Sequence, residues 1–125
     1  MSKKILIVDE DKRFLEKSQK MFDKYGFDVL ACESLKEAEE ISERNVPDIA
    51  IIDLLKHNDD SGFVLSYRLR KKFLDLPIII ISSVSARSGV FFTEEGREWI
   101  HADTILEKDT SSEQLLKEVF KLLKI

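Results

Sequence analysis

The sequence predicts a doubly wound α/β fold, in which a five-stranded parallel sheet carries helices on both faces. Short apolar runs, typical of buried strands, alternate five times with stretches whose apolar residues recur at helical spacing. The connections between them are short, and such alternation implies parallel strands joined by right-handed crossovers. For a chain of 125 residues, we expect the flavodoxin-like strand order 2-1-3-4-5.

The composition is that of one globular domain spanning residues 1–125, with 43% hydrophobic residues. The formal net charge of -4 is spread over 20 basic and 24 acidic residues, which provides no general field for attracting nucleic acid. Cys32 is the only cysteine, so an internal disulfide is excluded and a reducing compartment fits. The first apolar run is too short for a signal peptide or a membrane span. We therefore expect a cytoplasmic protein with neither nucleic acid nor membrane among its partners.

Apolar spacing and helix-end signals mark the elements of the first half of the chain. Gly26 is well placed to end the first helix, because glycine readily adopts the left-handed conformation that often follows a helix. Ser34 and Glu37 have the spacing of a capping box, which predicts the start of the second helix. The expected elements are a strand at 5–8, a helix at 12–25 with Phe14 and Tyr25 on its apolar face, an edge strand at 27–31 and a helix at 35–45.

The second half contains the two runs most typical of buried strands. Four apolar residues lead directly into Asp53, and four consecutive isoleucines, which are β-branched, follow Pro77. A capping box at residues 110–113 predicts the start of the last helix. The expected elements are a strand at 49–53, a helix from 62 or 63 to 73 with Val64 in the core, a strand at 78–81, a short helix from about 94 to 99, a strand at 104–106 and a last helix that includes 115–123.

Polar residues follow four of the predicted strands, each at the point where its strand ends. They are Asp9 with Glu10, then Asp53, Ser82 and Lys108. Because the carboxyl ends of parallel strands meet at one edge of a sheet, we expect these side chains to converge. Asp9 and Asp53 also follow strands 1 and 3, which flank the switch point where open α/β sheets bind ligands.

The acidic members of this group predict a metal site. Carboxylates held close together repel one another, and a bound divalent cation would compensate their charge. Since the group offers carboxylates and few nitrogen or sulfur ligands, it favours Mg²⁺. Lys108 adds a fixed positive charge and Ser82 adds a hydroxyl donor. A carboxylate nucleophile, a metal, a cation and a hydrogen-bond donor are together the parts that phosphoryl transfer needs.

Four stretches of the chain resemble the receiver domain of two-component response regulators, and the resemblance covers the whole length. Each stretch is weak evidence alone, but all four occur in order and each ends a predicted strand. They are ILIVDED at 5–11, PDIAIID at 47–53, LPIIIIS at 76–82 and ADTILEK at 102–108.

The resemblance implies a phosphorylation site at Asp53. A sensor histidine kinase would donate the phosphoryl group, and the phosphorylated domain would change its binding to a downstream protein that the sequence does not name. Ser82 and Lys108 match the hydroxyl and the lysine that contact the phosphoryl group. The domain would catalyse only its own phosphorylation and dephosphorylation, so it is not expected to be an enzyme in the usual sense. The implied Mg²⁺ ligands are Asp9, Glu10, Asp53 and the backbone carbonyl of Leu55.

The chain departs from the family's usual pattern in several places. Glu10 stands where the family usually has a second aspartate, Ile105 where it has an aromatic switch residue, and Asp109 where it has a proline. The segment that contains residues 84–101 is several residues longer than usual. These differences concern how a phosphorylated state would be read by a partner, and they leave the phosphorylation site itself in place.

Two alternative hypotheses remain open from the sequence. A pseudo-receiver, which is an interaction module that works without phosphate, would fit the residues at Ile105 and Asp109. A haloacid-dehalogenase-type phosphatase would fit the Asp-x-Asp pattern of Asp9 and Asp11 after the first strand. Such a phosphatase would usually carry a cap domain and an acidic pair after the fourth strand, and neither is found in the sequence.

Overall fold

The computed structural model describes residues 2–53, 61–82 and 102–125. In chain order the elements are β1 (Lys4–Val8), α1 (Lys12–Lys24), β2 (Asp28–Cys32), α2 (Leu35–Arg44), β3 (Ile49–Asp53), α3 (Ser61–Lys72), β4 (Ile78–Ser82), β5 (Thr104–Glu107) and α5 (Ser112–Leu123). Every strand predicted from the sequence is present, and no strand boundary differs by more than one residue. The short helix expected near 94–99 lies outside the described residues.

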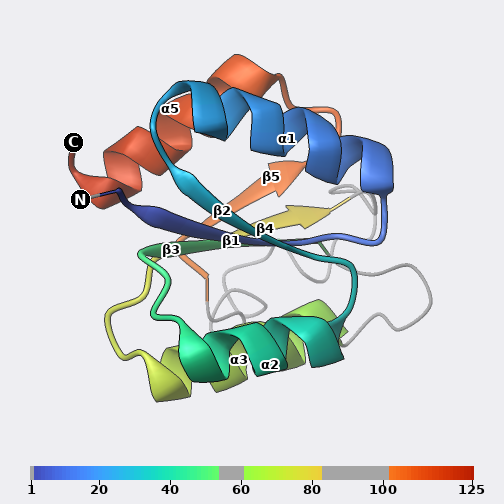
Figure 1. Ribbon diagram of the computed structural model, residues 1–125, viewed down its shortest axis with the longest axis vertical. Helices are drawn as coiled ribbons and strands as arrows, with labels where there is room; N and C mark the ends of the chain where they lie inside the picture. Colours follow the sequence, from blue (N-terminus) through green and yellow to red (C-terminus); the bar gives the residue numbers. More distant parts are fainter. Residues whose placement is uncertain (1, 54–60, 83–101) are drawn as a thin grey trace.

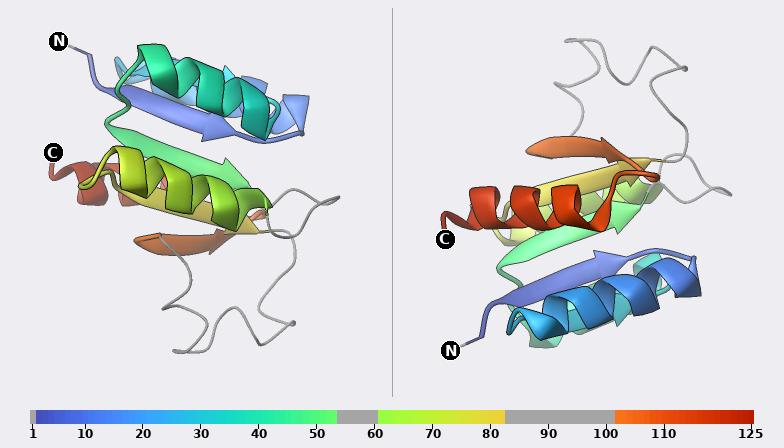
Figure 2. Two further views of the ribbon diagram at one scale, coloured as in Figure 1. Left: turned by 90° about the horizontal axis from the view of Figure 1, so that it is seen from below. Right: turned by 90° about the horizontal axis from the view of Figure 1, so that it is seen from above.

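The five strands form one parallel sheet in the order β2-β1-β3-β4-β5, which confirms the predicted fold class. β2 is an edge strand, as its half-exposed pattern predicted. Both termini lie at the amino ends of the strands (Figure 2). The carboxyl ends, where the polar residues of the predicted site follow, therefore lie at the opposite end of the molecule.

Helices cover both faces of the sheet, with α1 and α5 on one side and α2 and α3 on the other (Figure 1). The isoleucines of β4 show how this arrangement arises from the sequence. Ile79 and Ile81 belong to the core cluster beneath α1 and α5, whereas Ile78 and Ile80 belong to the cluster beneath α2 and α3. Since successive side chains of a strand point to opposite faces, a strand covered on both faces needs an unbroken apolar run.

The capping residues predicted for α1, α2 and α5 lie at the ends of these helices, except that the N-cap of α5 lies one residue later than predicted. The Ser34 hydroxyl accepts a hydrogen bond from the Glu37 N–H at 3.2 Å, and Gly26 has a positive φ of 85° after α1. At α5 the capping residue is Ser111, which accepts from the Gln114 N–H at 3.1 Å, so the predicted capping box at 110–113 was one residue early.

Two residues predicted to face the core are exposed. Tyr25 is 54% exposed and Val64 is 39% exposed. Tyr25 follows the last residue of α1 as its C-cap, where the chain leaves the helix and its ring contacts Phe120 at the surface. None of the described helices is long and apolar enough to cross a membrane.

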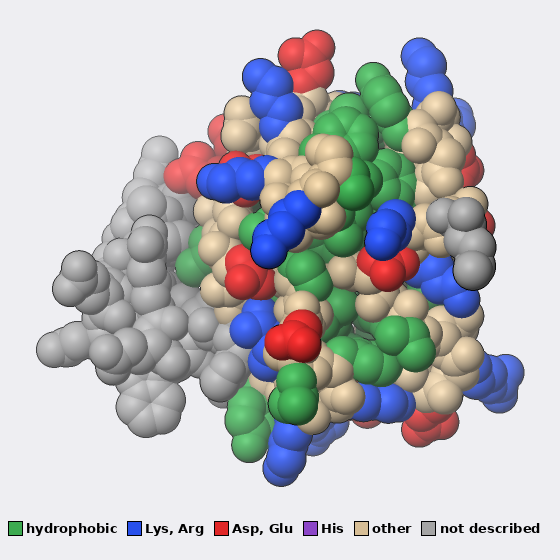
Figure 3. Space-filling model, turned by 90° about the vertical axis from the view of Figure 1, so that its left-hand side faces the viewer, with side chains coloured by type: hydrophobic (Ala, Val, Ile, Leu, Met, Phe, Trp, Pro, Cys, Tyr) green, Lys and Arg blue, Asp and Glu red, His purple; other side chains and the backbone are tan. Residues whose placement is uncertain are grey.

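A reciprocal hydrogen-bond motif occurs twice at the amino ends of the strands. Asp48, just before β3, donates its N–H to the Lys4 carbonyl at 2.8 Å and accepts the Lys4 N–H at 2.7 Å through its carboxylate. Asp103, just before β5, makes the same pair of bonds with Ile78, each at 2.8 Å. Asp103 also accepts a hydrogen bond from Arg70 of α3 at 2.9 Å. On this end of the molecule, acidic and basic side chains are interspersed (Figure 3).

Candidate functional site

Asp53 is the last residue of the central strand β3 and is only 7% exposed. β1 lies on one side of β3 and β4 on the other, and Asp53 itself is in register with Ile81. The neighbouring strands and the helices above and below them exclude water from most of the carboxylate. The sequence pattern of an apolar run ending in aspartate therefore places a carboxyl group at the edge of the buried sheet.

Asp9 follows β1 on the neighbouring strand and is 1% exposed. Its backbone N–H donates to the Cys32 carbonyl at 2.9 Å, which continues the ladder between β1 and β2 beyond the last paired residues. Its carboxylate Oδ1 accepts a hydrogen bond from the Asp11 N–H at 2.8 Å. Asp11 is the N-cap of α1, so the turn that begins this helix also fixes the orientation of Asp9.

Lys108 comes from the far edge of the sheet, directly after β5. Its backbone N–H donates to the Ser82 carbonyl at 3.0 Å, which holds it beside the end of β4. The ammonium forms an ion pair with Asp9 Oδ2 and lies 3.6 Å from Asp53 Oδ1. The latter distance is an ion-pair distance that is too long for a hydrogen bond. Lys108 thus joins residues that are far apart in the sequence into one charged group.

The electrostatics of this group leave Asp53 poorly compensated. The pKa of Asp53 is raised from 3.8 to about 7, first by burial and then by the carboxylate of Asp9, with a smaller upward effect from Glu10, while the Lys108 ammonium lowers it. Within the described part of the chain, Asp53 Oδ1 is buried without a hydrogen-bond partner. Buried polar atoms are rarely left unsatisfied in proteins, and those that are often belong to functional sites.

The predicted site also includes Ser82, Glu10 and Leu55. Ser82 ends β4 and is buried, and Glu10 is exposed beside Asp9. Leu55 lies outside the described residues. In the ranges that the structure describes, no three metal-ligating side chains are gathered into one cluster.

The departures from the family's pattern fall on both described and undescribed residues. Ile105 is half-buried and packs against the core cluster beneath α2 and α3. Asp109 is exposed, and the described residues contain no cis peptide bond. The segment at 84–101 lies outside the described residues.

Phe14 lies near the site, although the sequence placed it only on the apolar face of a helix. The Lys108 ammonium lies 4.4 Å from the centroid of the Phe14 ring. Phe14 belongs to the first turn of α1, five positions after Asp9. An aromatic residue in the first turn of a helix that starts at a predicted site was a signal that could have identified it.

A protein-family comparison decides the classification. The model of the "Response regulator receiver domain" matches residues 5–120, which is most of the chain. The chain belongs to the response regulator receiver domain family. Receiver domains are signalling modules of two-component systems.

Two curated relatives each match about two thirds of this chain. This receiver domain is 29% identical over 83 residues to the alkaline phosphatase synthesis transcriptional regulatory protein PhoP of Bacillus subtilis, covering 66% of this chain and 34% of the relative. It is also 29% identical over 82 residues to the photosynthetic apparatus regulatory protein RegA of Cereibacter sphaeroides, covering 66% of this chain and 44% of the relative. In both comparisons, the matched part of the relative is less than half of its length.

Solved structures of receiver domains have the same fold. A CheY-like receiver domain protein from Methanospirillum hungatei JF-1 superimposes with a TM-score of 0.84 at 21% identity, covering 99% of this chain and 95% of the other. The receiver domain of the Francisella response regulator 1452 superimposes with a TM-score of 0.81 at 28% identity, covering 98% of each chain. The arrangement of strands and helices is therefore that of receiver domains throughout the described residues.

Proposed function

We propose that this receiver domain, spanning residues 1–125, is a phosphorylation-dependent switch in a cytoplasmic two-component pathway. Asp53 accepts a phosphoryl group from a sensor histidine kinase, and the phosphorylated form changes its binding to a downstream protein. The observation that carries the proposal is the position of Asp53. It is a buried carboxylate at the end of the central strand, and its Oδ1, which has no hydrogen-bond partner in the described part of the chain, lies 3.6 Å from the Lys108 ammonium.

In the proposed reaction, a carboxylate oxygen of Asp53 attacks the phosphorus of the donor phosphohistidine. The new P–O bond forms as the P–N bond breaks, and the histidine nitrogen leaves with the bonding electrons. The attack brings negative charge against the carboxylates already present, so nearby positive charge lowers the barrier. Lys108 supplies such a charge beside both Asp9 and Asp53. Ser82, buried at the end of β4, is proposed to hydrogen-bond the transferred phosphoryl group.

The site is also suited to Mg²⁺. Asp53 Oδ1 has no hydrogen-bond partner among the described residues, and burial together with repulsion from Asp9 raises the pKa of Asp53. Both observations indicate that a further cation would be stabilising here. Oxygen ligands from carboxylates and a backbone carbonyl suit a hard divalent cation that keeps part of its water shell. We propose that Asp9, Glu10, Asp53 and the Leu55 carbonyl hold it. When bound, Mg²⁺ would neutralise negative charge on the phosphoryl oxygens.

Asp53→Asn is expected to abolish phosphorylation. The wild-type protein, incubated with acetyl phosphate and Mg²⁺, should acquire one acid-labile phosphoryl group, measured by intact-protein mass spectrometry or radiolabelling. The variant should acquire none, because an amide is a poor nucleophile. Asp23→Asn, at an exposed aspartate of α1, is the matched control and should label like the wild type. Equal labelling of Asp53→Asn and wild type would disprove the assignment, and an unlabelled wild type would favour the pseudo-receiver.

Mg²⁺ is expected to raise the melting temperature of the unphosphorylated protein, because a ligand that binds only the folded state stabilises it. Glu10→Gln should reduce this shift if the exposed Glu10 side chain helps to hold the ion. Glu16→Gln, at an exposed glutamate of α1, is the control and should keep the full shift. An undiminished shift in Glu10→Gln would remove Glu10 from the proposed ligands.

A further inference from the structure

The ammonium of Lys108 lies over the ring of Phe14 and beside two carboxylates. The distance of 4.4 Å between Nζ and the centroid of Phe14 is well inside the range of about 6 Å over which a ring face attracts a cation. Phe14 is half-buried and packs against the core cluster beneath α1 and α5. The side chain of Lys108 is itself only 23% exposed. The contact is therefore made where water competes weakly for the ammonium.

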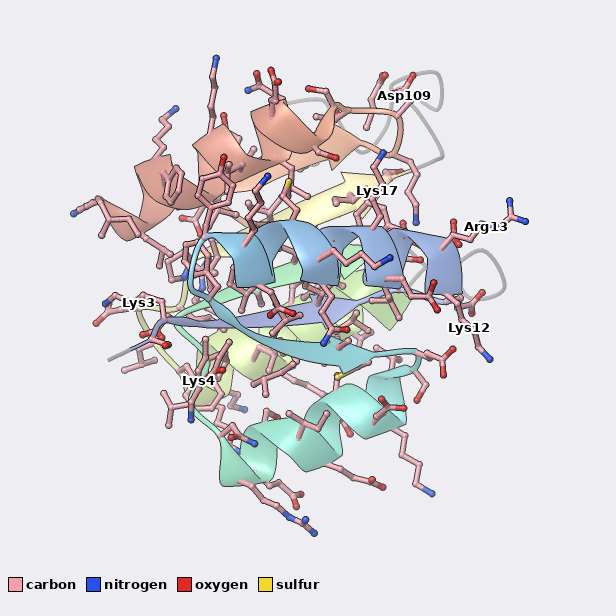
Figure 4. All side chains as sticks on the ribbon, turned by 45° about the horizontal axis from the view of Figure 1, so that its top comes forward. Lys3, Lys4, Lys12, Arg13, Lys17 and Asp109 are labelled. Carbon is pink, nitrogen blue, oxygen red and sulfur yellow. The ribbon has the colours of Figure 1, made fainter. Side chains whose placement is uncertain are left out.

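The first turn of α1 fixes both the ring and the carboxylate that hold this ammonium. The Asp11 carboxylate accepts hydrogen bonds from the N–H groups of Arg13 at 2.9 Å and Phe14 at 3.4 Å, while its own N–H donates to Asp9. Lys12 and Arg13 project away from the protein at this end of the helix (Figure 4). Of the three residues that begin α1, Phe14 is thus the one directed to the site.

We propose that Phe14 is a positioning residue for phosphoryl transfer to Asp53, and that its ring face keeps the Lys108 ammonium where the incoming phosphoryl group needs it. The inference rests on the proposed function. The ion pair with Asp9 draws the ammonium away from Asp53, which is the more distant of the two carboxylates. Attraction to a ring face depends less on direction than a hydrogen bond does, so the ring holds the ammonium in the site and still lets it shift toward a phosphoryl oxygen. An aliphatic side chain would fill the same space without this attraction.

The test weakens the ring's attraction while its shape is nearly unchanged. Phenylalanines carrying one, two or three ring fluorines are incorporated at position 14, and the rate of labelling by acetyl phosphate with Mg²⁺ is measured. Fluorine withdraws electron density from the ring face, so the rate constant should fall stepwise, by roughly three- to tenfold for the most fluorinated ring. Phe14→Tyr should stay close to wild type, whereas Phe14→Leu should resemble the most fluorinated variant.

Phe73 provides a matched control, because Lys72 lies 5.6 Å from the centroid of its ring, at the end of α3 away from the site. The same fluorinated residues at position 73 should leave the labelling rate unchanged. A labelling rate that stays constant through the Phe14 series, in a wild type that is labelled normally, would overturn the inference and leave the proposed function intact.

A second measurement examines the contact without any reaction. In the unphosphorylated protein, the methylene protons next to the Lys108 ammonium should show an upfield ring-current shift in NMR spectra, and Phe14→Leu should remove it. Absence of the shift in the wild type would overturn the inference. If the wild type were never labelled, the proposed function would fail and the role of Phe14 in it would fail too, whatever the ring-current shift.

Discussion

Asp53→Asn is expected to increase the free energy of unfolding at neutral pH, by up to about 4 kcal/mol. The pKa of Asp53 is raised from 3.8 to about 7 in the folded protein, first by burial and then by the Asp9 carboxylate. Each unit of such a difference corresponds to about 1.4 kcal/mol. The ionised carboxylate thus destabilises the folded state, and an amide of nearly the same shape removes that cost.

The sign follows from proton binding. In the unfolded chain Asp53 releases its proton near its ordinary pKa, whereas in the folded protein it keeps the proton up to about pH 7. Between those values the folded state binds more protons, so the wild-type free energy of unfolding declines as pH rises, and the whole loss is present above about pH 7. The difference between variant and wild type should therefore be small near pH 4 and largest above pH 7.

Urea denaturation across this pH range, with EDTA present to remove metal, measures the effect. Asp23→Asn is the control, because this exposed aspartate should show little change at any pH. A variant less stable than wild type above pH 7 would contradict the electrostatic account of Asp53. Added Mg²⁺ should narrow the gap by stabilising the wild type, since the proposed ion compensates the same charge.

Lys108→Met is expected to destabilise the protein by about 3 kcal/mol at neutral pH. The substitution keeps an apolar stem but leaves the Asp9 carboxylate, 1% exposed, with the Asp11 N–H as its only hydrogen-bond partner among the described residues. Removing one member of a buried pair typically costs about 3–5 kcal/mol, and the lower end applies here because Lys108 is partly exposed.

The double variant Asp9→Asn/Lys108→Met distinguishes this mechanism from loss of packing. Because it removes both charges, it should regain much of the stability that Lys108→Met loses. Lys121→Met, at an exposed lysine of α5, should have little effect. A double variant no more stable than Lys108→Met would indicate that the methylene stem, rather than the charge, is what Lys108 contributes to folding.

The fold could be predicted from the sequence because each strand is buried in a regular way. The unbroken isoleucine run of β4 is explained by a covered sheet, and it supplies alternate residues to the two core clusters. Two of the errors occurred where a helix begins or ends. Tyr25 continues the apolar spacing of α1 but follows its last helical residue. Ser111, rather than Thr110, is the N-cap of α5.

For the site, the positions of the strand ends predicted which residues come together. They did not predict which carboxylate the Lys108 ammonium pairs with. The convergence of Asp9, Asp53 and Lys108 follows from sheet topology alone. That the ammonium pairs more closely with Asp9 than with Asp53 depends on the Asp11 turn and on side-chain packing, which no spacing reveals. The contact between Lys108 and Phe14 was missed because the apolar face of α1 also accounts for a phenylalanine at that position.

Aspartates occur at both ends of this sheet. Those at the amino ends of the strands hydrogen-bond to backbone groups, whereas those at the carboxyl ends belong to the candidate site. The carboxylates of Asp48 and Asp103 each accept one backbone N–H, and each aspartate closes a ring with the first residue of a neighbouring strand, Lys4 or Ile78. These rings join β1 to β3 and β4 to β5, the two pairs whose far ends carry Asp9 with Asp53 and Ser82 with Lys108. A slip of one residue in either pair would turn every following side chain to the opposite face. The end of the sheet that carries the candidate site is therefore aligned by hydrogen-bonded carboxylates a full strand length away.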